Sequence, residues 1–406
     1  MVAVAFVAPY LLETTARFVE AAARLPGVEL GLITTEPVDH VPARLRQHVA
    51  THWRIDDALD PAQIAAAVRG LSTQTARIER LIGVLEQLQV PLAQVREHLG
   101  LPGVDVATAV RFRDKAHMKT VLRAAGVPCA RHRLADSAAV ARSFIEDVGF
   151  PVVVKPPAGA GAKSTFRLDD AEDLRVWLDG APPTPDQPAL LEEFLTGDEG
   201  SFDSVTVDGR LVWHSVSHYL PTPLEVLRNP WVQWAVLMPR DISGPDYAPL
   251  HATASAALNA LGLDTGLTHM EWFRRPDRSI AVSEVAVRPP GGGISEMLNY
   301  THDMDVYTAW ARLMVFGDFD PPERRWSVGA VFPRGQGSGR VRAVHGLDRL
   351  QAEIGALVME ARLPQPGQIS SNGYEGDGFI VVRHPETATV LDALRRLVTG
   401  IHVELD

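Results

Sequence analysis

Two glutamates and an arginine stand close together in one stretch of the sequence, in a pattern that suits metal-assisted chemistry. Glu271 lies in THMEWF and Glu284 in SEVAVRPPGGG, and a tight Pro-Asp turn between these two predicted strands would bring the carboxylates together. Both lie among residues typical of a core, where two carboxylates repel each other unless a cation neutralises them. Hard oxygen ligands favour Mg²⁺, which usually keeps several waters and shares its coordination with substrate phosphates. The pattern therefore predicts a magnesium site at Glu271 and Glu284.

Arg288 follows Glu284 by four residues, so its side chain would lie on the same face of the strand. There it can neutralise another anionic group beside the metal. Each glutamate alone is more simply interpreted as a surface residue of an edge strand. That interpretation is much weaker for the two glutamates and the arginine together.

A second stretch, PVVVKPPAGAGAKST at 151–165, has the composition of a phosphate-binding loop. Its small residues would let backbone N–H groups approach a phosphate, while Lys155 and Lys163 supply positive charge. It does not match GxxxxGK[ST], because Ala162 precedes Lys163, nor GxGxxG, because Ser164 replaces the last glycine. On its own, such a glycine run is more often a plain hairpin turn.

The composition excludes several classes of protein. A chain of 406 residues is too long for one core of typical size, which predicts two to four domains. Because 46% of the residues are hydrophobic and 22% charged, the chain is neither disordered nor fibrous. The 39 basic and 50 acidic residues give a net charge of −11 without a basic stripe, which argues against a nucleic-acid partner. A few local cations must therefore hold any anionic ligand.

The same sequence indicates a cytoplasmic setting. The single cysteine, Cys129, cannot form an internal disulfide, and no Cys/His cluster has zinc spacing. The first residues, MVAVAFVAPY, lack a basic region and are broken by Pro9, so they indicate a first strand rather than a signal peptide. No apolar run approaches the ~20 residues that would span a bilayer, and no membrane association is expected.

The elements that would carry these residues begin as an α/β unit. Strand candidates alternate with helical patterns at residues 2–8, 14–25, 28–34, 52–55 and 61–70. Such alternation is typical of a doubly wound domain with a parallel sheet. The segment 78–100 predicts further helices.

The middle of the chain predicts helices and one strand, whereas the end of the chain predicts mostly strands. Residues 116–125 and 138–148 predict helices, and residues 151–155 predict a strand that ends in Lys155. From residue 190 strands dominate, at 189–195, 201–207, 210–216, 267–273 and 279–287, with helices at 250–261 and 306–315. A linker is expected at 321–325, followed by a hairpin of 327–333 with 340–344 and a closing helix at 388–398.

Taken in order, these motifs resemble the ATP-grasp superfamily. They are RDKAHMK at 113–119, GVP at 126–128, FPVVVKP at 150–156, LEEFLTGDE at 191–199, and Glu271 with EVAVRPPGG at 284–292. The match covers nearly the whole chain and is most similar to the amino-acid (dipeptide) ligase branch of carboxylate-amine ligases. The resemblance implies an α/β and α+β architecture: an N-terminal doubly wound α/β domain (1–105), a small α+β lid subdomain (106–190), and a larger C-terminal antiparallel-sheet domain with catalytic (191–322) and strand-rich (323–406) subdomains.

The resemblance also implies where ATP would bind. Lys115 and Lys155 would contact its phosphates, and the glycine-rich loop would fold over them with Gly159, Gly161, Lys163 and Ser164. The backbone of an interdomain hinge would read the adenine edge, at Glu192, Glu193, Phe194 and Leu195. Glu199 would lie on the ribose hydroxyls.

The resemblance also implies roles for the two glutamates and the arginine. Glu271 and Glu284 would hold Mg²⁺, and Arg288 would face the acyl phosphate or the substrate carboxylate. The glycine stretch that includes Gly291 and Gly292 would line the amino-acid pocket. The chain departs from many relatives at Ala286, where they have an asparagine, which leaves one metal or phosphate contact without a counterpart.

The implied activity is ATP-dependent amide formation between a carboxylate and an amine, through an acyl phosphate, with release of ADP and phosphate and an amino acid expected as one substrate. Cations fixed around the transferred phosphoryl group and the later oxyanion would lower both barriers. A carboxylase-type or purine-pathway ATP-grasp enzyme and a nucleotide-binding sensor without turnover are the alternatives. Relatives commonly dimerise through the N-terminal domain, and a homodimer is left open.

Further candidates are open to two interpretations. His269 would share the strand face of Glu271 and could reach the substrate, although a lone histidine is more often a hydrogen-bonded core residue. Tyr219, Trp231 and Trp234 lie in a proline-punctuated segment of irregular pattern, where they would cover the substrate or merely pack the segment down. The turn-rich loop 370–378 could close over the site, but a simple hairpin connection is the stronger interpretation.

Overall fold

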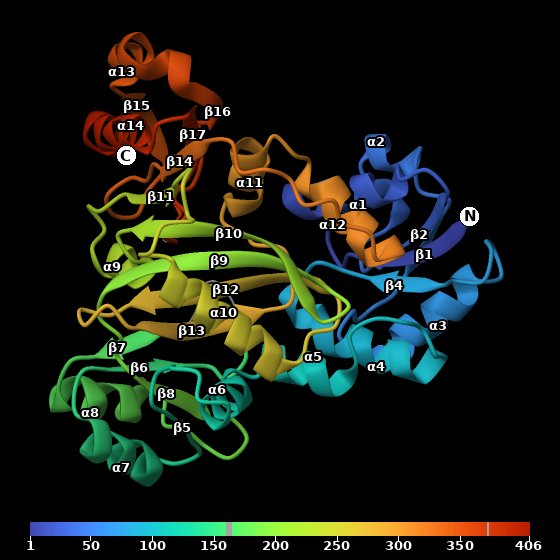
Figure 1. Cartoon of the computed structure of the whole chain (residues 1–406), viewed down its shortest axis with the longest axis horizontal. Coiled ribbons are helices and arrows are strands. Elements are labelled where there is room, and N and C mark those ends of the chain that lie inside the picture. Colours follow the sequence, from blue (N-terminus) through green and yellow to red (C-terminus); the bar gives the residue numbers. More distant parts are fainter. Residues whose placement is uncertain (160–164, 372) are drawn as a thin grey trace.

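A parallel sheet forms the N-terminal part of the protein. The structure is a computed structural model that describes residues 1–159, 165–371 and 373–406 (Figure 1). Its first sheet has the strand order β3-β2-β1-β4, and both neighbours of β1 run parallel to it. The strands are β1 (Val2–Val7), β2 (Val28–Thr34), β3 (Thr51–Arg54) and β4 (Arg80–Ile82). The predicted α/β opening of the chain is therefore confirmed.

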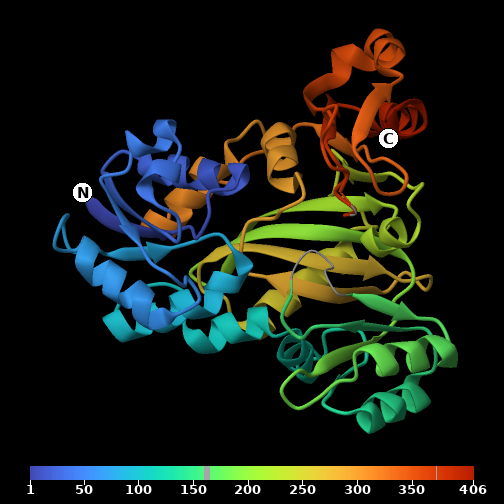
Figure 2. The same ribbon diagram turned by 180° about the vertical axis from the view of Figure 1, so that it is seen from behind.

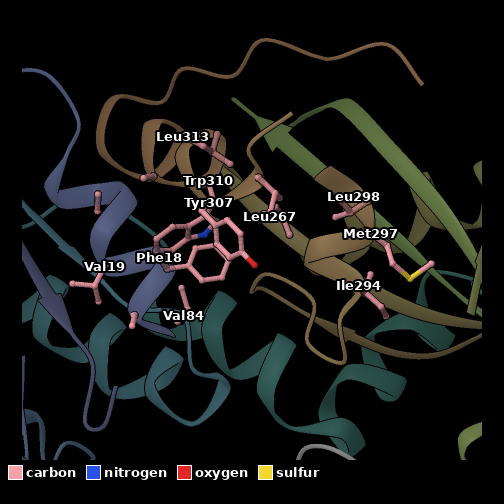
Figure 3. Packing of buried hydrophobic residues seen from close by; sticks show 14 of the residues in the cluster. Phe18, Val19, Val84, Leu267, Ile294, Met297, Leu298, Tyr307, Trp310 and Leu313 are labelled. Carbon is pink, nitrogen blue, oxygen red and sulfur yellow. The ribbon is translucent and has the colours of Figure 1, made fainter. Parts of the chain in front are cut away.

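Helices cover both faces of this sheet. The N-terminal helices are α1 (Glu13–Ala23), α2 (Ala43–Arg46), α3 (Pro61–Leu71) and α4 (Gln89–Leu99), with 3₁₀ turns η1 (Val38–His40) and η2 (Glu86–Leu88). Alternate residues of β1 pack on opposite faces, one against α3 and α4 and the other against α1. Helix α12 (Val306–Phe316), from much later in the chain, also joins the second face. There the Phe18 ring meets Tyr307 and Trp310 edge-on, at centroid distances of 4.7 and 5.1 Å (Figure 3).

The expectation that residues 78–100 contain only helices was wrong. The three residues of β4 pair in parallel with β1 before η2 and α4 begin. Leu81 and Ile82 are buried in this position. A strand of three residues is too short to show a period of two, so the apolar pair was interpreted as part of a helix.

A small antiparallel sheet follows, at the bottom of Figure 1, with strand order β5-β8-β6-β7. Helices α5 (Val106–Arg113) and α6 (Lys115–Ala124) lead into it. Its elements are β5 (His132–Ala135), α7 (Ala138–Val148), β6 (Val152–Lys155), β7 (Phe166–Leu168), α8 (Ala171–Gly180) and β8 (Ala189–Glu193). Apolar residues of α7 and α8 pack on one face and form a core of their own.

The largest sheet has eight strands in the order β13-β12-β9-β10-β11-β14-β17-β16, and every neighbouring pair is antiparallel. Its first five strands in the chain are β9 (Asp198–Val207), β10 (Arg210–Leu220), β11 (Trp234–Met238), β12 (Gly266–Arg274) and β13 (Ile280–Ala286). The accompanying helices are α9 (Pro223–Arg228), α10 (Ala248–Leu261) and α11 (Ile294–His302). Helix α10 lies over the β12–β13 end of this sheet, as both views show (Figures 1 and 2).

The last part of the chain extends the same sheet. Its elements are β14 (Ser327–Phe332), β15 (Val341–His345), α13 (Leu347–Ile354), η3 (Gly355–Leu357), β16 (Val358–Arg362), β17 (Phe379–His384), α14 (Thr387–Gly400) and β18 (His402–Leu405). The expected hairpin of β14 with β15 was wrong, because β14 pairs with β11 and β17 whereas β15 pairs with β18. All six residues of β14 are buried, as befits a central strand. The domain boundaries at 105, 190 and 322 stay predictions.

The mixed α/β and antiparallel architecture agrees with the predicted fold class. Two of the aromatic residues assigned to an irregular segment lie instead in strands, since Tyr219 belongs to β10 and Trp234 to β11. In the part of the chain that the structure describes, no helix combines the length and the apolar character needed to cross a bilayer.

Candidate active site

A cavity of about 1290 Å³ lies where the three larger sheets approach one another. Residues of the N-terminal domain, of the small antiparallel sheet and of the large sheet all line it. The predicted site residues at its wall are Lys115, Lys155, Gly159, Glu192, Glu193, Phe194, Leu195, Glu199, His269, Glu271, Glu284, Arg288, Gly291 and Gly292. The structure therefore brings together residues that are up to 177 positions apart, from 115 to 292. Gly161, Lys163 and Ser164 lie outside the described residues.

Glu271 and Glu284 are direct cross-strand partners. They occupy paired positions of the neighbouring strands β12 and β13, next to an irregularity in the register between Glu271 and Trp272. Burial and the nearby charge of Glu284 raise the pKa of Glu271 above its usual value. Burial acts in the same direction on Glu284, but Lys115, Lys155 and Arg288 together outweigh it and lower the pKa of that carboxyl. Glu284 thus has a lysine as a close ion-pair partner at 2.6 Å, whereas Glu271 has His269 Nε2 at 3.9 Å.

Lys115 is the first residue of helix α6, and the start of this helix sets its position. The side chain of Asp114 caps this helix by accepting hydrogen bonds from the backbone N–H groups of Ala116 and His117, at 2.9 Å each. The Lys115 ammonium then reaches Glu284 Oε1 at 2.6 Å and donates to the Gly159 carbonyl at 2.9 Å. The lysine therefore joins the carboxylate pair to the start of the glycine-rich loop.

Lys155, at the end of β6, belongs to a buried group of three charges. Its ammonium lies 3.0 Å from Glu192 Oε2, and Lys119 Nζ lies 3.4 Å from Glu192 Oε1. Although burial opposes ionisation of Glu192, the two lysines lower the pKa of its carboxyl. Lys119 also donates to the Ser283 carbonyl at 2.6 Å, beside Glu284 in the chain. The Glu192 side chain is thus engaged by lysines, and the backbone of Glu192 and Glu193 is paired with the neighbouring strands β5 and β6.

The predicted hinge leaves the sheet directly after Glu193. Phe194, Leu195, Thr196 and Gly197 line the cavity beyond the end of β8. The Arg167 guanidinium covers the Phe194 ring at 4.1 Å from its centroid. Glu199 lines the cavity from β9, and burial together with the charge of Glu271 raises its pKa well above the usual value.

His269 has a fully buried partner that the sequence did not suggest. Asp203 lies opposite His269 in the β9–β12 register, and Asp203 Oδ1 is 2.7 Å from His269 Nδ1. Ser201 donates to the other oxygen of Asp203 at 2.8 Å. The second ring nitrogen, Nε2, lies 3.9 Å from Glu271 Oε1. His269 is therefore a hydrogen-bonded core residue that also lines the cavity, and its contact with the substrate stays a prediction.

Arg288 reaches the cavity from the segment just after β13. It donates from Nε to Glu86 Oε2 at 3.0 Å and from Nη1 to the carbonyl of Pro289 at 3.0 Å. Arg113 donates to the other oxygen of Glu86 at 2.9 Å. The sequence did not single out Glu86, which lies 202 residues from Arg288 in an unremarkable segment.

Aromatic residues form the wall near Gly291 and Gly292. The Trp234 ring packs edge-on against Tyr219 and Tyr374, at centroid distances of 5.4 and 4.8 Å. Tyr374 and Glu375 belong to the loop 370–378, which connects the paired strands β16 and β17 and also lines the cavity. The loop is thus both a strand connection and part of the cavity wall. Trp231 is 64% exposed and lines a different cavity of about 370 Å³.

The carboxylate pair fits a divalent cation on the evidence of its own charges. Glu271 is half-buried beside a second carboxylate, and a cation between them would relieve the repulsion that, with burial, raises its pKa. Within the described residues, no group of three or more His, Cys, Asp and Glu side chains is arranged to hold a metal. Two carboxylates suit Mg²⁺, which completes its shell with water and phosphate. Ala286, buried at the cavity wall, offers no ligand atom there.

Comparisons with known proteins agree with this geometry. No family model matches the chain. The L-arginine-specific L-amino acid ligase of Bacillus subtilis is 25% identical over 281 residues, which are 68% of this chain and 67% of that ligase. The crystal structure of an L-amino acid ligase from Bacillus licheniformis has a TM-score of 0.79 at 18% identity and covers 100% of this chain and 99% of its own.

A second kind of enzyme has a similar structure. The carboxyaminoimidazole ribonucleotide synthase of Aspergillus clavatus, solved as a complex with ATP, has a TM-score of 0.70 at 16% identity. The match covers 98% of this chain and 97% of that chain. In fold the chain is similar to ATP-grasp ligases, and in sequence it is similar to amino-acid ligases.

Proposed function

We propose that the protein is an ATP-dependent ligase that converts a carboxylate to an acyl phosphate and joins it to an amine as an amide. ADP and phosphate are the other products. The observation that carries this proposal is the pair Glu271 and Glu284, set face to face at the cavity wall with Lys115 at 2.6 Å from one of them. A carboxylate pair beside lysines at the wall of a cavity suits the transfer of a phosphoryl group better than it suits a purely structural role.

The lysines and the carboxylate pair would bind the phosphates of ATP. Lys115 and Lys155 would bind phosphate oxygens, and Glu271 and Glu284 would hold Mg²⁺, which supplies charge neutralisation for the transferred phosphoryl group. Lys155 is kept cationic by Glu192, because this contact, with the nearby Glu284, raises the pKa of the lysine against the effect of burial. The hinge from Phe194 to Gly197 would bind the adenine through its backbone.

Arg288 would act on the acyl group. Its guanidinium would stabilise the negative charge that develops on the substrate carboxylate and then on the tetrahedral oxyanion. Burial lowers the pKa of an arginine, but Glu86 raises that of Arg288, so the side chain remains a cation. A fixed cation of this kind contributes most where water is excluded, and the Arg288 side chain is mostly buried.

An amino acid is the proposed carboxylate substrate. The support is similarity to the L-arginine-specific L-amino acid ligase and to the L-amino acid ligase of known structure. The wall formed by Trp234, Tyr219 and Tyr374 offers aromatic faces to an amino-acid side chain or ammonium group. A cytoplasmic location, expected from the single, buried and free Cys129, belongs to the same proposal.

An ATP-turnover panel tests the proposal. Amino acids are added singly and in pairs to the full chain with ATP and Mg²⁺, and ADP, phosphate and product mass are measured. At least one pair should raise ADP release and yield a product with the mass of an amide. Hydroxylamine should trap the activated acid as a hydroxamate. A broad panel in which no acid or amine raises turnover would overturn the proposal.

A second candidate function rests on the ribonucleotide synthase of similar fold. Such an enzyme would activate bicarbonate instead of an amino acid. Turnover that depends on bicarbonate and an aminoimidazole ribonucleotide, and on no amino acid, would favour it. A sensor without turnover would bind ATP in calorimetry and release no ADP. The presence of Glu271, Glu284, Lys115, Lys155 and Arg288 at one cavity argues against a sensor.

A further inference from the structure

Glu86 is a buried carboxylate that the N-terminal domain contributes to the cavity. It stands in η2, directly after β4, and its side chain is 6% exposed. Each of its oxygens receives an arginine from a different part of the chain. Arg113 Nη1 donates to Oε1 at 2.9 Å, and Arg288 Nε donates to Oε2 at 3.0 Å. The carboxylate therefore links the end of α5 to the segment after β13.

These contacts fix how Arg288 presents its guanidinium. Nε is bound to Glu86 and Nη1 to the Pro289 carbonyl, both at 3.0 Å. A planar group held at two of its nitrogens cannot turn about its own axis, so the direction of the third nitrogen is set by the protein. Arg288 is thereby oriented before any substrate binds.

The same carboxylate is linked to the phosphate side of the cavity. Arg113 Nη1, which contacts Glu86, also donates to the Gly159 carbonyl at 3.2 Å. Lys115 donates to that carbonyl at 2.9 Å and contacts Glu284 at 2.6 Å. A continuous series of polar contacts therefore runs from Arg288 through Glu86 to the lysine beside the carboxylate pair.

We propose that Glu86 is a positioning residue of the active site, which holds Arg288 at the acyl group. Arg113 and Lys115 connect Glu86 to the phosphate-binding side of the cavity and keep that side aligned with Arg288. This inference rests on the proposed function for the meaning of the Arg288 site. It gives the N-terminal domain a part in the reaction, because the domain supplies the anion that orients a cation of the catalytic sheet. Glu86 itself need not touch the substrate.

The simpler interpretation is that Glu86 only holds two domains together. Glu296 provides a matched control, because it is a similarly buried carboxylate that pairs with an arginine of the N-terminal domain. Arg17 Nη1 lies 3.4 Å from Glu296 Oε1, and Tyr307 donates to the same oxygen at 2.6 Å. Glu296 is 8% exposed and is not among the residues that line the cavity. A purely structural role predicts equal effects of the two glutamates.

The kinetic test compares Glu86→Gln with Glu296→Gln in the full-length enzyme, using the acid and amine that the turnover panel identifies. Glu86→Gln should lower kcat by roughly 10- to 100-fold, because a displaced Arg288 no longer meets the transition state. It should raise KM for the carboxylate while KM for ATP stays within about two-fold. Glu296→Gln should lower the midpoint of thermal unfolding and leave kcat and both KM values near those of the wild type.

Two results would overturn the proposal. One is wild-type kinetics in Glu86→Gln, and the other is the same change in kcat and KM in both variants. If Glu86→Gln does not fold, Glu86→Asp keeps the charge but is too short to span both arginines, and it should show the same split between kcat and KM.

A crystal structure of Glu86→Gln provides a readout that does not depend on turnover. The Arg288 guanidinium should leave the Pro289 carbonyl and lose its defined orientation, whereas an unmoved Arg288 would overturn the positioning role. If the wild-type enzyme turns over no acid and amine, the proposed function fails, and this structural readout still decides whether Glu86 positions Arg288.

Discussion

Glu271 and Glu284 face each other across β12 and β13, and their carboxyl pKa values shift in opposite directions. Burial alone would raise both values. The difference arises because Lys115 lies 2.6 Å from Glu284, whereas burial and the repulsion of Glu284 prevail at Glu271. The pair therefore retains an affinity for one more positive charge at the place where a phosphate would meet the protein.

Replacement of Glu284 by glutamine should abolish ligation and leave the fold intact. The change removes one charge from the cation site and releases Lys115, but it removes almost no packing. We expect turnover to fall by roughly 100-fold or more, and the Mg²⁺ concentration that gives half-maximal activity to rise. Steady-state ADP release across a Mg²⁺ titration measures both effects.

The control for this variant is Glu353→Gln, on the surface of α13, where the carboxylate pairs with Arg349 and Arg396. It should have wild-type activity. A Glu284→Gln enzyme with normal turnover would remove this residue from the active site, whatever its contact with Lys115.

Replacement of Arg288 by alanine should damage turnover more than ATP binding. The guanidinium is engaged by Glu86 and Pro289, and in the proposed function its loss would remove a cation from the oxyanion and not from the nucleotide. We expect kcat to fall by roughly 100- to 1000-fold, with the Kd for ATP changed by less than about three-fold. Calorimetry of ATP binding and steady-state kinetics separate the two quantities.

Arg278→Ala is the matched control for Arg288. Arg278 lies in the turn between β12 and β13 and pairs with Asp246 at an exposed position. Its loss should change neither quantity. If Arg288→Ala instead weakened ATP binding and left kcat intact, the arginine would belong to the nucleotide site.

Replacement of Glu192 by glutamine should destabilise the protein strongly. Lys119 is fully buried and Lys155 nearly so, and both would lose their carboxylate partner. Removing one partner of a buried ionic group typically costs about 3–5 kcal/mol, because an unpaired charge stays in the interior. Urea unfolding of the apoprotein measures this loss.

The neighbouring glutamate offers a close comparison. Glu193 pairs with the half-exposed Arg131 at 2.5 Å, and exposed pairs of this kind contribute only about 0–1 kcal/mol. Glu193→Gln should therefore lower the free energy of unfolding by about 1 kcal/mol or less. Equal losses in the two variants would contradict the buried ionic group inferred for Glu192.

Local pairing is the part of the site that the sequence could predict. Glu271 and Glu284 belong to two strands joined by a short turn, so their approach follows from the hairpin itself, and Lys155 follows from the end of one apolar strand. The contact of Glu86 with Arg288 spans 202 residues and joins two domains, and no periodicity encodes such a contact. The pairing of Asp203 with His269 was not suggested by the sequence either, because it joins strands that are 66 residues apart in the chain.

The same distinction explains the errors in the fold. Strand β4 has three residues, too few for a recognisable alternation, and it exists because β1 provides its partner. Strand β14 is correctly placed in the sequence, but its partners come from residues 234–238 and 379–384 and not from the next strand. Which strands become neighbours is decided by the packing of the whole sheet.

Acid should destabilise the protein through its buried histidines. Burial lowers the pKa of His302 to about 3, and nearby Arg324 acts in the same direction. Its Nε2 is buried with no hydrogen-bond partner among the residues the structure describes. Burial also lowers the pKa values of His214 and His218 to about 4. All three are therefore neutral in the folded protein at pH values where an unfolded chain would bind protons.

The direction of the effect follows from proton binding. Above an unfolded pKa of about 6.5, both states are neutral and these histidines add no pH dependence. As the pH falls from about 6.5 toward 4, the unfolded chain takes up protons that the folded protein excludes. Each such histidine then lowers the free energy of unfolding by up to about 1.4 kcal/mol per pH unit. Stability should accordingly fall with pH in this window.

His302→Phe tests the contribution of one histidine. The ring packs edge-on against Trp213 at 5.0 Å, a contact that phenylalanine can keep, although the hydrogen bond to the Glu323 carbonyl is lost. The variant should show a shallower loss of stability between pH 6 and pH 4 in urea unfolding, by up to about 1.4 kcal/mol per pH unit. His40→Phe, at an exposed position, should keep the wild-type slope. An unchanged slope in His302→Phe would mean that the folded protein accepts a proton on this buried ring.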